Sequence, residues 1–234
     1  MNIEILQLID GAKKARGLTV VIDVFRAFTV EAYAMAAGAE RILPVGSVED
    51  AYALKAAHPE YLLMGERGGK KCPGFDFGNS PSQIARADLR GKTLVHTTSA
   101  GTQGIANAVH ADEILTGSLV NAAATARYIL ARNPEHVSLV CMGLEGRMPT
   151  EEDTLCAEYI KALLIGQSPD ITAEMDDLRN TSGAKFFDPA QQEAFPQPDF
   201  DMCIQLNRFD FALSVSAVPT DNRCRVWETK ICRL

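Results

Sequence analysis

Short runs of β-branched residues alternate with longer alanine-rich segments of helical period from residue 18 onward. Such alternation is typical of strands that are connected by crossover helices. It predicts an α/β fold with a largely parallel or mixed sheet. We expect strands at residues 18–24, 41–45, 61–64, 93–96, 113–115 and 137–142, and helices at 27–37, 48–57, 81–87, 102–109, 121–131 and 151–164.

The pattern weakens after Gly166, where proline, glutamine and aspartate become frequent. Phe209, Phe211, Leu213 and Val215 then alternate as in a half-buried strand. We therefore expect residues 1–234 to form one unit, with a lobe junction near 166–205 and a smaller α/β lobe in the C-terminal part. No internal repeat or low-complexity tract interrupts this unit.

Composition narrows the class of function. The 234 residues are 47% hydrophobic and carry a formal net charge of -7. An acidic chain repels nucleic acid phosphates and anionic membranes, so we expect neither as a partner. No apolar run approaches the roughly 20 residues of a membrane helix, and the first ten residues lack the features of a signal peptide. These observations predict a cytoplasmic protein.

The cysteines and histidines do not have the spacing of a metal site. The absence of a Cys-x-x-Cys pair disfavours a zinc ribbon or a redox pair and predicts reduced thiols. His96, at a strand end, is the histidine placed to reach a substrate, although a structural role is the simpler interpretation. The six cysteines are Cys72, Cys141, Cys156, Cys203, Cys224 and Cys232.

Ligands of open α/β sheets bind beyond the carboxyl ends of the strands, and four such ends are unusually polar here. At the first, Asp23 and Arg26 directly follow an apolar run. A carboxylate and a guanidinium so close together are able to serve one site. The alternative is an ordinary ion pair that caps the next helix.

The second polar end is a glycine-rich loop over residues 65–81. Its glycines permit close backbone approach to an anion. Ser80 and Pro81 predict that the loop ends at a helix N-terminus, which also favours anions. The charged side chains of the loop are Glu66, Arg67, Lys70, Lys71 and Asp76.

The third end, residues 97–102, is rich in hydroxyl groups and resembles a phosphate cradle, without matching a nucleotide-binding motif.

At the fourth end, Cys141 and Arg147 have the spacing of a cysteine-dependent phosphatase loop. Glu145 argues against a reactive thiolate there, because a nearby carboxylate raises the pKa of a thiol. Glu152 and Asp153 follow, either as helix-start residues or as a carboxylate pair that faces the site.

Carboxylates without histidines favour a hard cation. Mg²⁺ is commonly held by one or two carboxylates together with substrate phosphate. We expect Asp23 and Glu66 to bind Mg²⁺, together with Asp153 or Asp76.

Five blocks of the sequence, in order, resemble the 2-phosphosulfolactate phosphatase (ComB) family. The resemblance covers about residues 18–208 and implies a three-layer α/β/α fold. It also implies a Mg²⁺-dependent phosphatase that converts 2-phosphosulfolactate to sulfolactate and phosphate, a step toward coenzyme M. The blocks are residues 23–27, 65–69, 74–81, 97–102 and 152–156.

A mechanism follows from this resemblance as a hypothesis. Asp23 and Glu66 place Mg²⁺ on the phosphate, whereas Arg26 and Arg67 neutralise its developing charge. Asp76 or Asp153 orients the attacking water. The remaining cationic side chains of these loops bind the carboxylate and the sulfonate of the substrate. The catalytic set is then Asp23, Arg26, Glu66, Arg67 and Asp76. The expected substrate-binding residues are Gly69, Lys70, Asn79, Ser80, Thr98, Ser99, Gly101, Thr102 and Arg147.

Two alternatives remain open at this point. One is a non-catalytic sensor that binds a small phosphorylated metabolite and has no need of a metal. The other keeps the phosphatase but makes Cys141 the nucleophile. A homodimer is expected only because two-fold assemblies are common.

Overall fold

The computed structural model describes residues 1–218 and 226–233. Within this part of the chain, ten strands form one mixed sheet in the order β1-β8-β2-β7-β9-β10-β3-β6-β4-β5. The strands are β1 (Asn2–Gln7), β2 (Gly17–Ile22), β3 (Arg41–Pro44), β4 (Leu62–Arg67), β5 (Lys70–Lys71), β6 (Thr93–Thr97), β7 (Ala111–Gly117), β8 (His136–Cys141), β9 (Ala212–Val218) and β10 (Val226–Cys232).

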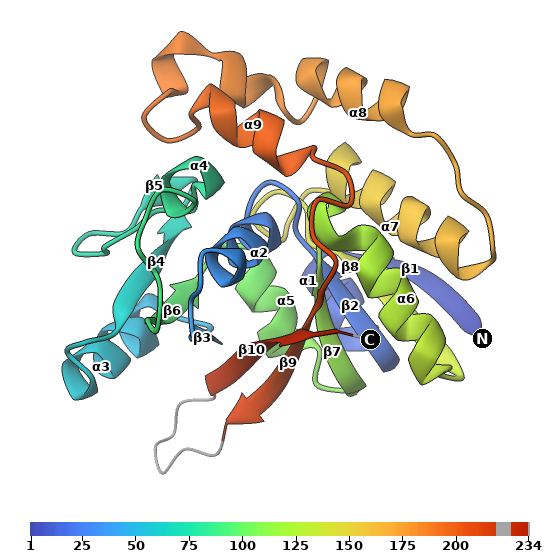
Figure 1. Ribbon diagram of the computed structural model, residues 1–234, viewed down its shortest axis with the longest axis horizontal. Coiled ribbons are helices and arrows are strands. Elements are labelled where there is room, and N and C mark those ends of the chain that lie inside the picture. Colours follow the sequence, from blue (N-terminus) through green and yellow to red (C-terminus); the bar gives the residue numbers. More distant parts are fainter. Residues whose placement is uncertain (219–225, 234) are drawn as a thin grey trace.

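The helices of the described residues lie mainly in the connections between these strands (Figure 1). The α-helices are α1 (Leu8–Lys14), α2 (Ala27–Ala36), α3 (Val48–Ala57), α4 (Pro81–Ile84), α5 (Gly101–Asn107), α6 (Ala122–Arg132), α7 (Glu151–Leu164), α8 (Thr172–Asp177) and α9 (Gln197–Cys203). The short 3-10 helices are η1 (Leu119–Asn121), η2 (Leu178–Asn180), η3 (Ala184–Phe187) and η4 (Pro189–Gln191).

The sheet consists of two parallel halves joined by an antiparallel pair. Strands β1, β8, β2 and β7 are parallel to one another, and so are β3, β6 and β4. Between the halves, β9 pairs antiparallel with β7 and β10 pairs antiparallel with β3. The sheet is therefore mixed, and its centre is formed by the last two strands in the chain.

Helices on both faces of the sheet make the three layers. In the first half, α6 and α7 pack on one face around Leu139 and Ile160, and α1 and α5 pack on the other around Val21 and Val140. In the second half, α2 and α3 cover opposite faces. Burial of these apolar side chains is the main contribution to the stability of such a layered fold.

Two crossover helices meet where the chain passes between the halves. Helix α2 leads from β2 to β3, and α5 leads from β6 to β7. A Cβ atom at Gly101 would lie 2.8 Å from Cβ of Ala27 and 2.9 Å from Oδ2 of Asp23. Glycine at position 101 therefore lets the two helix starts approach each other beside Asp23.

A run of short helices, from η2 to α9 (residues 178–203), lies across the carboxyl-end edge of the sheet. We call it the cap segment. Figure 1 shows α9 and its neighbours above the strand ends, in orange. Phe186 and Phe200 are its buried core, and Phe25 from the loop after β2 packs against them. The cap segment thus covers the edge at which ligands of α/β sheets bind.

The structure confirms the α/β fold, and the expected strands and helices between residues 18 and 164 are present. Helices α3 and α7 have the expected bounds. The sequence pattern did not predict β1, α1 or β10, and the strand expected from residue 209 begins at Ala212. Edge strand β1 has only exposed and half-buried positions, so it lacks the continuous apolar run that marks the buried strands.

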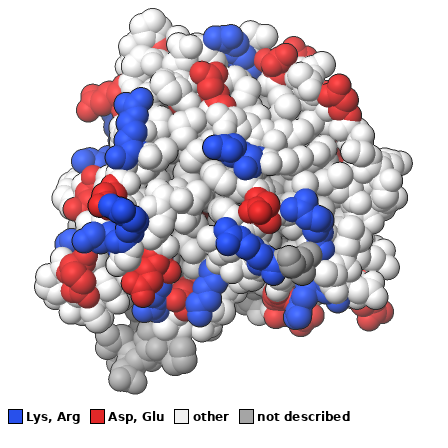
Figure 2. Space-filling view, in the orientation of Figure 1, with Lys and Arg blue, Asp and Glu red and all other residues white. Residues whose placement is uncertain are grey.

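None of the helices in residues 1–218 and 226–233 is long and apolar enough to cross a bilayer. On the face shown in Figure 2, acidic and basic side chains of the described residues are interspersed.

Replacement of Gly104 tests the packing of α5 on the sheet. An added Cβ would collide with Cγ1 of Val21 and with Sδ of Met142, which is 2.5 Å away. We expect Gly104→Ala to lower the free energy of unfolding by about 1–3 kcal/mol, the usual cost of overpacking. Urea denaturation measures this. Gly46→Ala is the control, because its Cβ would make an ordinary contact at 3.8 Å; equal effects of the two substitutions would contradict the packing described.

Candidate active site

A pocket of about 280 Å³ lies where strand ends from both halves of the sheet meet the cap segment. The loops after β2, β4, β6 and β8 supply its floor, and the cap segment supplies the opposite wall. Its lining residues are Asp23, Phe25, Arg26, Glu66, Gly68, Gly69, Asn79, Ser99, Ala100, Gly143, Leu144, Glu145, Thr150, Glu152, Lys185, Gln191 and Phe195.

Asp23 lies at the centre of the floor, between the two helix starts. Its Oδ1 accepts a hydrogen bond of 3.0 Å from the backbone N–H of Ala27. The pKa of Asp23 is raised to about 6, mainly by burial and also by the nearby charges of Glu66 and Glu152. The backbone N–H groups of Ala27 and Gly101 act in the opposite direction. The site thus concentrates negative charge at one buried point.

Glu66 ties two loops together at the same floor. Its Oε1 accepts a 2.7 Å bond from the N–H of Ser99, and its Oε2 accepts a 2.6 Å bond from the N–H of Gly69. Oε2 also accepts a 3.3 Å bond from the hydroxyl of Ser99, whereas Oε1 keeps a second lone pair. The Glu66 carboxylate therefore orders the loops and remains able to accept a further ligand.

Glu152 and Asp153 are adjacent on α7 but have different surroundings. Both oxygens of Asp153 bond backbone N–H groups, those of Val24 and Gly143, at 2.8 Å. Glu152 lines the pocket instead, and its buried Oε2 has no hydrogen-bond partner among the described residues. Burial raises the pKa of both carboxyls, and that of Asp153 is raised further by Glu152 and Asp23. Asp153 thus fixes the loops after β2 and β8, whereas Glu152 presents a carboxyl to the pocket.

Arg26 is held rigidly at the boundary between floor and cap. Its Nη1 donates to Oδ2 of Asp199 at 2.7 Å, and both side chains are almost fully buried. Its guanidinium lies 4.6 Å from the ring centre of Phe195. Phe195 packs on Gly69, where the backbone has φ +79 and a Cβ would collide with the ring. The other oxygen of Asp199 accepts a 2.8 Å bond from Ser80, so Arg26 is anchored through the cap to the loop before α4.

His96 is buried behind the pocket instead of facing it. One ring nitrogen lies 2.8 Å from Oε1 of Glu31, and the other lies 3.3 Å from Oδ1 of Asn79. His96 and Glu31 have no exposed surface. Because its oxygen faces the histidine, Asn79 keeps its amide NH2 group as a donor at the pocket.

A second, adjoining pocket of about 350 Å³ holds two of the predicted cations, Arg67 and Arg147. It shares Gly68, Ser99 and Glu145 with the first pocket. The guanidinium of Arg67 bonds the backbone oxygen of Glu66 and the hydroxyl of Thr97. Thr98 and Gln103 complete its polar lining.

The structure brings together some of the predicted site residues and separates others. Asp23, Arg26, Glu66, Gly69, Asn79 and Ser99 line the first pocket, and Arg67, Arg147, Thr98 and Ser99 line the second. Several predicted residues line neither of these pockets, and their site roles stay predictions. These are Lys70, Asp76, Ser80, Gly101, Thr102 and Asp153.

Several of the residues outside the pockets have structural partners. Asp76 accepts a 2.8 Å bond from the N–H of Leu63. Ser80 accepts from the N–H of Gln83, as predicted for an N-cap. Thr98 and Thr102 bond each other reciprocally, because each hydroxyl accepts from the backbone N–H of the other residue. These hydroxyls hold the turn in shape.

Cys141 is buried and lines neither pocket. Burial raises its pKa, and the nearby Asp153 raises it further. A thiol with a raised pKa is a poor nucleophile. Cys72, Cys141, Cys156, Cys203 and Cys232 are free thiols, and Cys224 lies outside the described residues.

No group of three or more His, Cys, Asp and Glu side chains in the described residues is arranged to hold a metal ion by itself. Mg²⁺ commonly takes one or two carboxylates from the protein and its other ligands from water and phosphate. Asp23 and Glu66, which share the pocket floor, fit that pattern.

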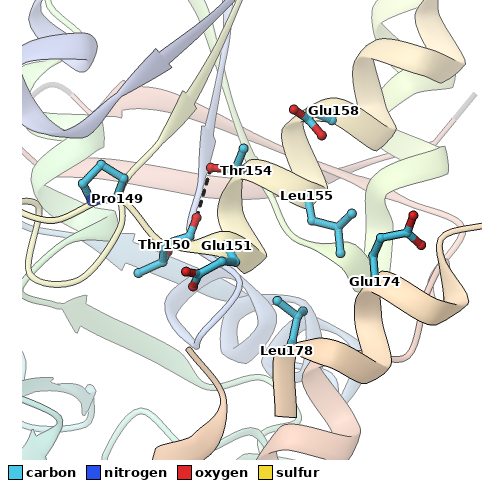
Figure 3. Close-up of a pocket in the computed structure, with 8 residues that line it drawn as sticks. All are labelled: Pro149, Thr150, Glu151, Thr154, Leu155, Glu158, Glu174 and Leu178. Atoms are coloured by element: carbon cyan, nitrogen blue, oxygen red, sulfur yellow. Dashed lines mark hydrogen bonds between the residues drawn. The ribbon is translucent and has the colours of Figure 1, made fainter. Parts of the chain in front are cut away.

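A larger depression, of about 420 Å³, lies between α7 and α8 (Figure 3). Glu151, Glu158 and Glu174 line it, and its lining includes no lysine or arginine. An anion would be repelled by these carboxylates. The smaller pocket at the strand ends is therefore the better candidate for an anionic ligand.

Sequence reasoning missed the contribution of the cap segment. Lys185, Gln191 and Phe195 line the pocket, although they are far from the strand ends in sequence. No local motif marks them. The sequence singles out Glu152 and Asp153 together, and only their hydrogen-bond partners in the structure distinguish the two.

Comparisons with known proteins give matches over most of the chain. The profile of a protein family described as 2-phosphosulpholactate phosphatase matches residues 3–216. A protein of Bacillus subtilis named "Probable 2-phosphosulfolactate phosphatase" is 34% identical over 212 residues, which cover 88% of this chain and 91% of that protein. Proteins of the same name from Carboxydothermus hydrogenoformans and Caldanaerobacter subterraneus are 43% identical over 168 residues and 33% identical over 205 residues. They cover 71% and 82% of this chain, and the matches span 69% and 84% of those proteins.

The raised pKa of Asp23 predicts a pH effect on stability. Between about pH 4 and pH 6 the folded protein retains a proton that the unfolded chain has lost, so the free energy of unfolding falls as pH rises. Asp23→Asn keeps an oxygen acceptor for Ala27 and removes this titration. We expect the variant to be more stable than the wild type at pH 7 by about 2–3 kcal/mol, and to lose less stability between pH 4 and pH 6.

Urea denaturation in EDTA at several pH values measures this difference. Asp201→Asn, at an exposed position, is the control and should change stability by less than about 0.5 kcal/mol. Parallel pH profiles of Asp23→Asn and the wild type would contradict the buried-carboxylate account.

Proposed function

Because the chain belongs to the 2-phosphosulfolactate phosphatase family, we propose that it is a Mg²⁺-dependent phosphatase that hydrolyses 2-phosphosulfolactate to sulfolactate and phosphate. The family makes it a phosphoric monoester hydrolase. The observation that carries the proposal is the pocket itself, where Asp23, Glu66 and Glu152 converge beside Arg26. A cavity of about 280 Å³ is of the size that a small ester occupies.

The carboxylates of the pocket support a divalent cation. Buried carboxylates that raise the pKa of Asp23 repel one another, and a cation between them relieves that repulsion. Asp23 and Glu66 would hold Mg²⁺. When bound, the ion supplies a Lewis acid for a phosphoryl oxygen.

Glu152 is the proposed general base for the attacking water. It lines the pocket, its Oε2 lacks a hydrogen-bond partner among the described residues, and burial raises its pKa, which makes its carboxylate a stronger base. Asp153 is less suitable, because both of its oxygens bond backbone N–H groups. In this proposal Glu152 orients the attacking water, the role that the sequence suggested for Asp76 or Asp153.

Arg26 and the neighbouring donors serve the phosphate. Arg26 is held in place by Asp199 and Phe195, so its charge needs little reorganisation when negative charge develops on the phosphoryl group. The amide of Asn79 is a further donor at the pocket, and the hydroxyl of Ser99, which donates to Oε2 of Glu66 at 3.3 Å, lines it as well. Preorganised donors of this kind supply most of the rate in phosphoryl transfer.

The first test measures phosphate release from 2-phosphosulfolactate with Mg²⁺ and with EDTA. We expect turnover with Mg²⁺, its loss in EDTA, and its recovery when excess Mg²⁺ is restored. Thermal stabilisation by 2-phosphosulfolactate without any turnover would instead support a non-catalytic sensor. A panel of other phosphorylated hydroxy acids shows which tail the protein prefers.

The second test replaces the charged groups one at a time. We expect Asp23→Asn and Arg26→Met each to lower kcat/KM by on the order of 10²- to 10³-fold, the usual effect of losing one electrostatic contact in the transition state. Asp88→Asn and Arg90→Met are matched controls, because both side chains are exposed. Near-normal turnover of both pocket variants would falsify the assignment of the site.

A further inference from the structure

The cap segment places one lysine in the pocket opposite the carboxylates. Lys185, on η3, lines the same cavity as Asp23 and Glu66. Its positive charge acts on Glu152, whose pKa it lowers against the larger effect of burial. Lys185 therefore faces the floor of the site from the cap side.

Three aromatic rings surround its ammonium group. Nζ lies 5.3 Å from the ring centre of Phe195, 5.7 Å from that of Phe186 and 5.8 Å from that of Phe25. Aromatic faces attract a cation and displace water without neutralising its charge. The rings belong to a cluster that also packs against Arg26, so the lysine is oriented by the structure that fixes the site.

Among the described residues, Lys185 also forms no ion pair with a carboxylate. Within residues 1–218 and 226–233, none of the ion pairs within 4.0 Å includes Lys185. The other cation that lines this pocket, Arg26, is paired with Asp199 at 2.7 Å. A partly desolvated ammonium that touches no carboxylate directly, at the wall of a cavity, favours binding of an anion from solution.

We propose that Lys185 binds an acid group in the tail of the substrate and so determines specificity for phosphorylated hydroxy acids over plain phosphate. The inference rests on the proposed function. The phosphate lies at the strand ends, beside Arg26 and the carboxylates, and the tail extends toward the cap. A sulfonate and a carboxylate are the two acid groups that 2-phosphosulfolactate offers, and either is able to accept hydrogen bonds from an ammonium.

The experiment compares Lys185→Met with the wild type. Methionine keeps an unbranched, apolar side chain against the three rings and removes only the charge. We expect the KM for 2-phosphosulfolactate to rise by on the order of 10- to 100-fold, as for the loss of a hydrogen bond to a charged group, while kcat changes little. The Ki of inorganic phosphate, which has no tail, should stay the same. Lys92→Met, at an exposed position, should change neither constant.

A second substrate identifies the acid group. 2-Phospholactate carries the carboxylate without the sulfonate. An equal rise in its KM assigns the contact to the carboxylate, and an unchanged KM assigns it to the sulfonate; both results support the proposal. Equal losses for substrate and inorganic phosphate would overturn it, because Lys185 would then act on the phosphoryl group. Unchanged constants for all three ligands would overturn it as well.

Failure of the proposed function would be recognised separately, as a wild type that hydrolyses neither ester. Isothermal titration with sulfolactate and with inorganic phosphate then replaces kinetics. Weaker binding of sulfolactate alone by Lys185→Met supports the proposal, whereas equal affinities of the two proteins, or no binding of sulfolactate to the wild type, overturn it. Thermal unfolding of each variant verifies that the fold is intact.

Discussion

The close approach of α2 and α5 at Gly101 is the constraint on which the site depends. The sheet has two parallel halves, and the chain passes between them through these helices. They meet without a side chain at position 101, and Asp23 lies directly beside the contact. Strand ends that are several strands apart in the sheet therefore contribute to one pocket. A larger residue at this point would push apart the two loops that carry the carboxylates.

The resulting pocket concentrates buried charge, and the surrounding structure compensates for part of it. Burial of an ionised group is costly unless it is paired or hydrogen-bonded. Arg26 and Asp199 satisfy that requirement together, and the Asp153 carboxylate does so through two backbone N–H groups. Asp23 and Glu152 are less fully compensated, and their pKa values are raised. Carboxyl groups with raised pKa values are common at active sites, where a bound ligand or metal ion compensates their charge.

The cap segment connects the stability of the fold with the chemistry of the pocket. Its phenylalanines bury apolar surface over the strand ends, and the same rings orient Arg26 and Lys185. Asp199, near its end, bonds Arg26 and the residues that begin α4. Rigid anchoring of this kind is what electrostatic catalysis requires, because donors that are already oriented need not reorganise during the reaction.

The sequence by itself determined the order of the main strands and helices between residues 18 and 164, without the two-residue strand β5, and the position of Asp23, Arg26 and Glu66 at strand ends. Local residue periodicity and turn chemistry are sufficient for both. Only the tertiary structure decided that the last two strands join the parallel halves, because strand pairing depends on contacts between distant segments. It also distinguished Glu152 from Asp153: neighbouring side chains on a helix point about 100° apart, so one reaches the pocket and the other reaches the backbone. Lys185 and Phe195 belong to the site for the same physical reason, since packing, and not sequence proximity, brings the cap segment over the strand ends.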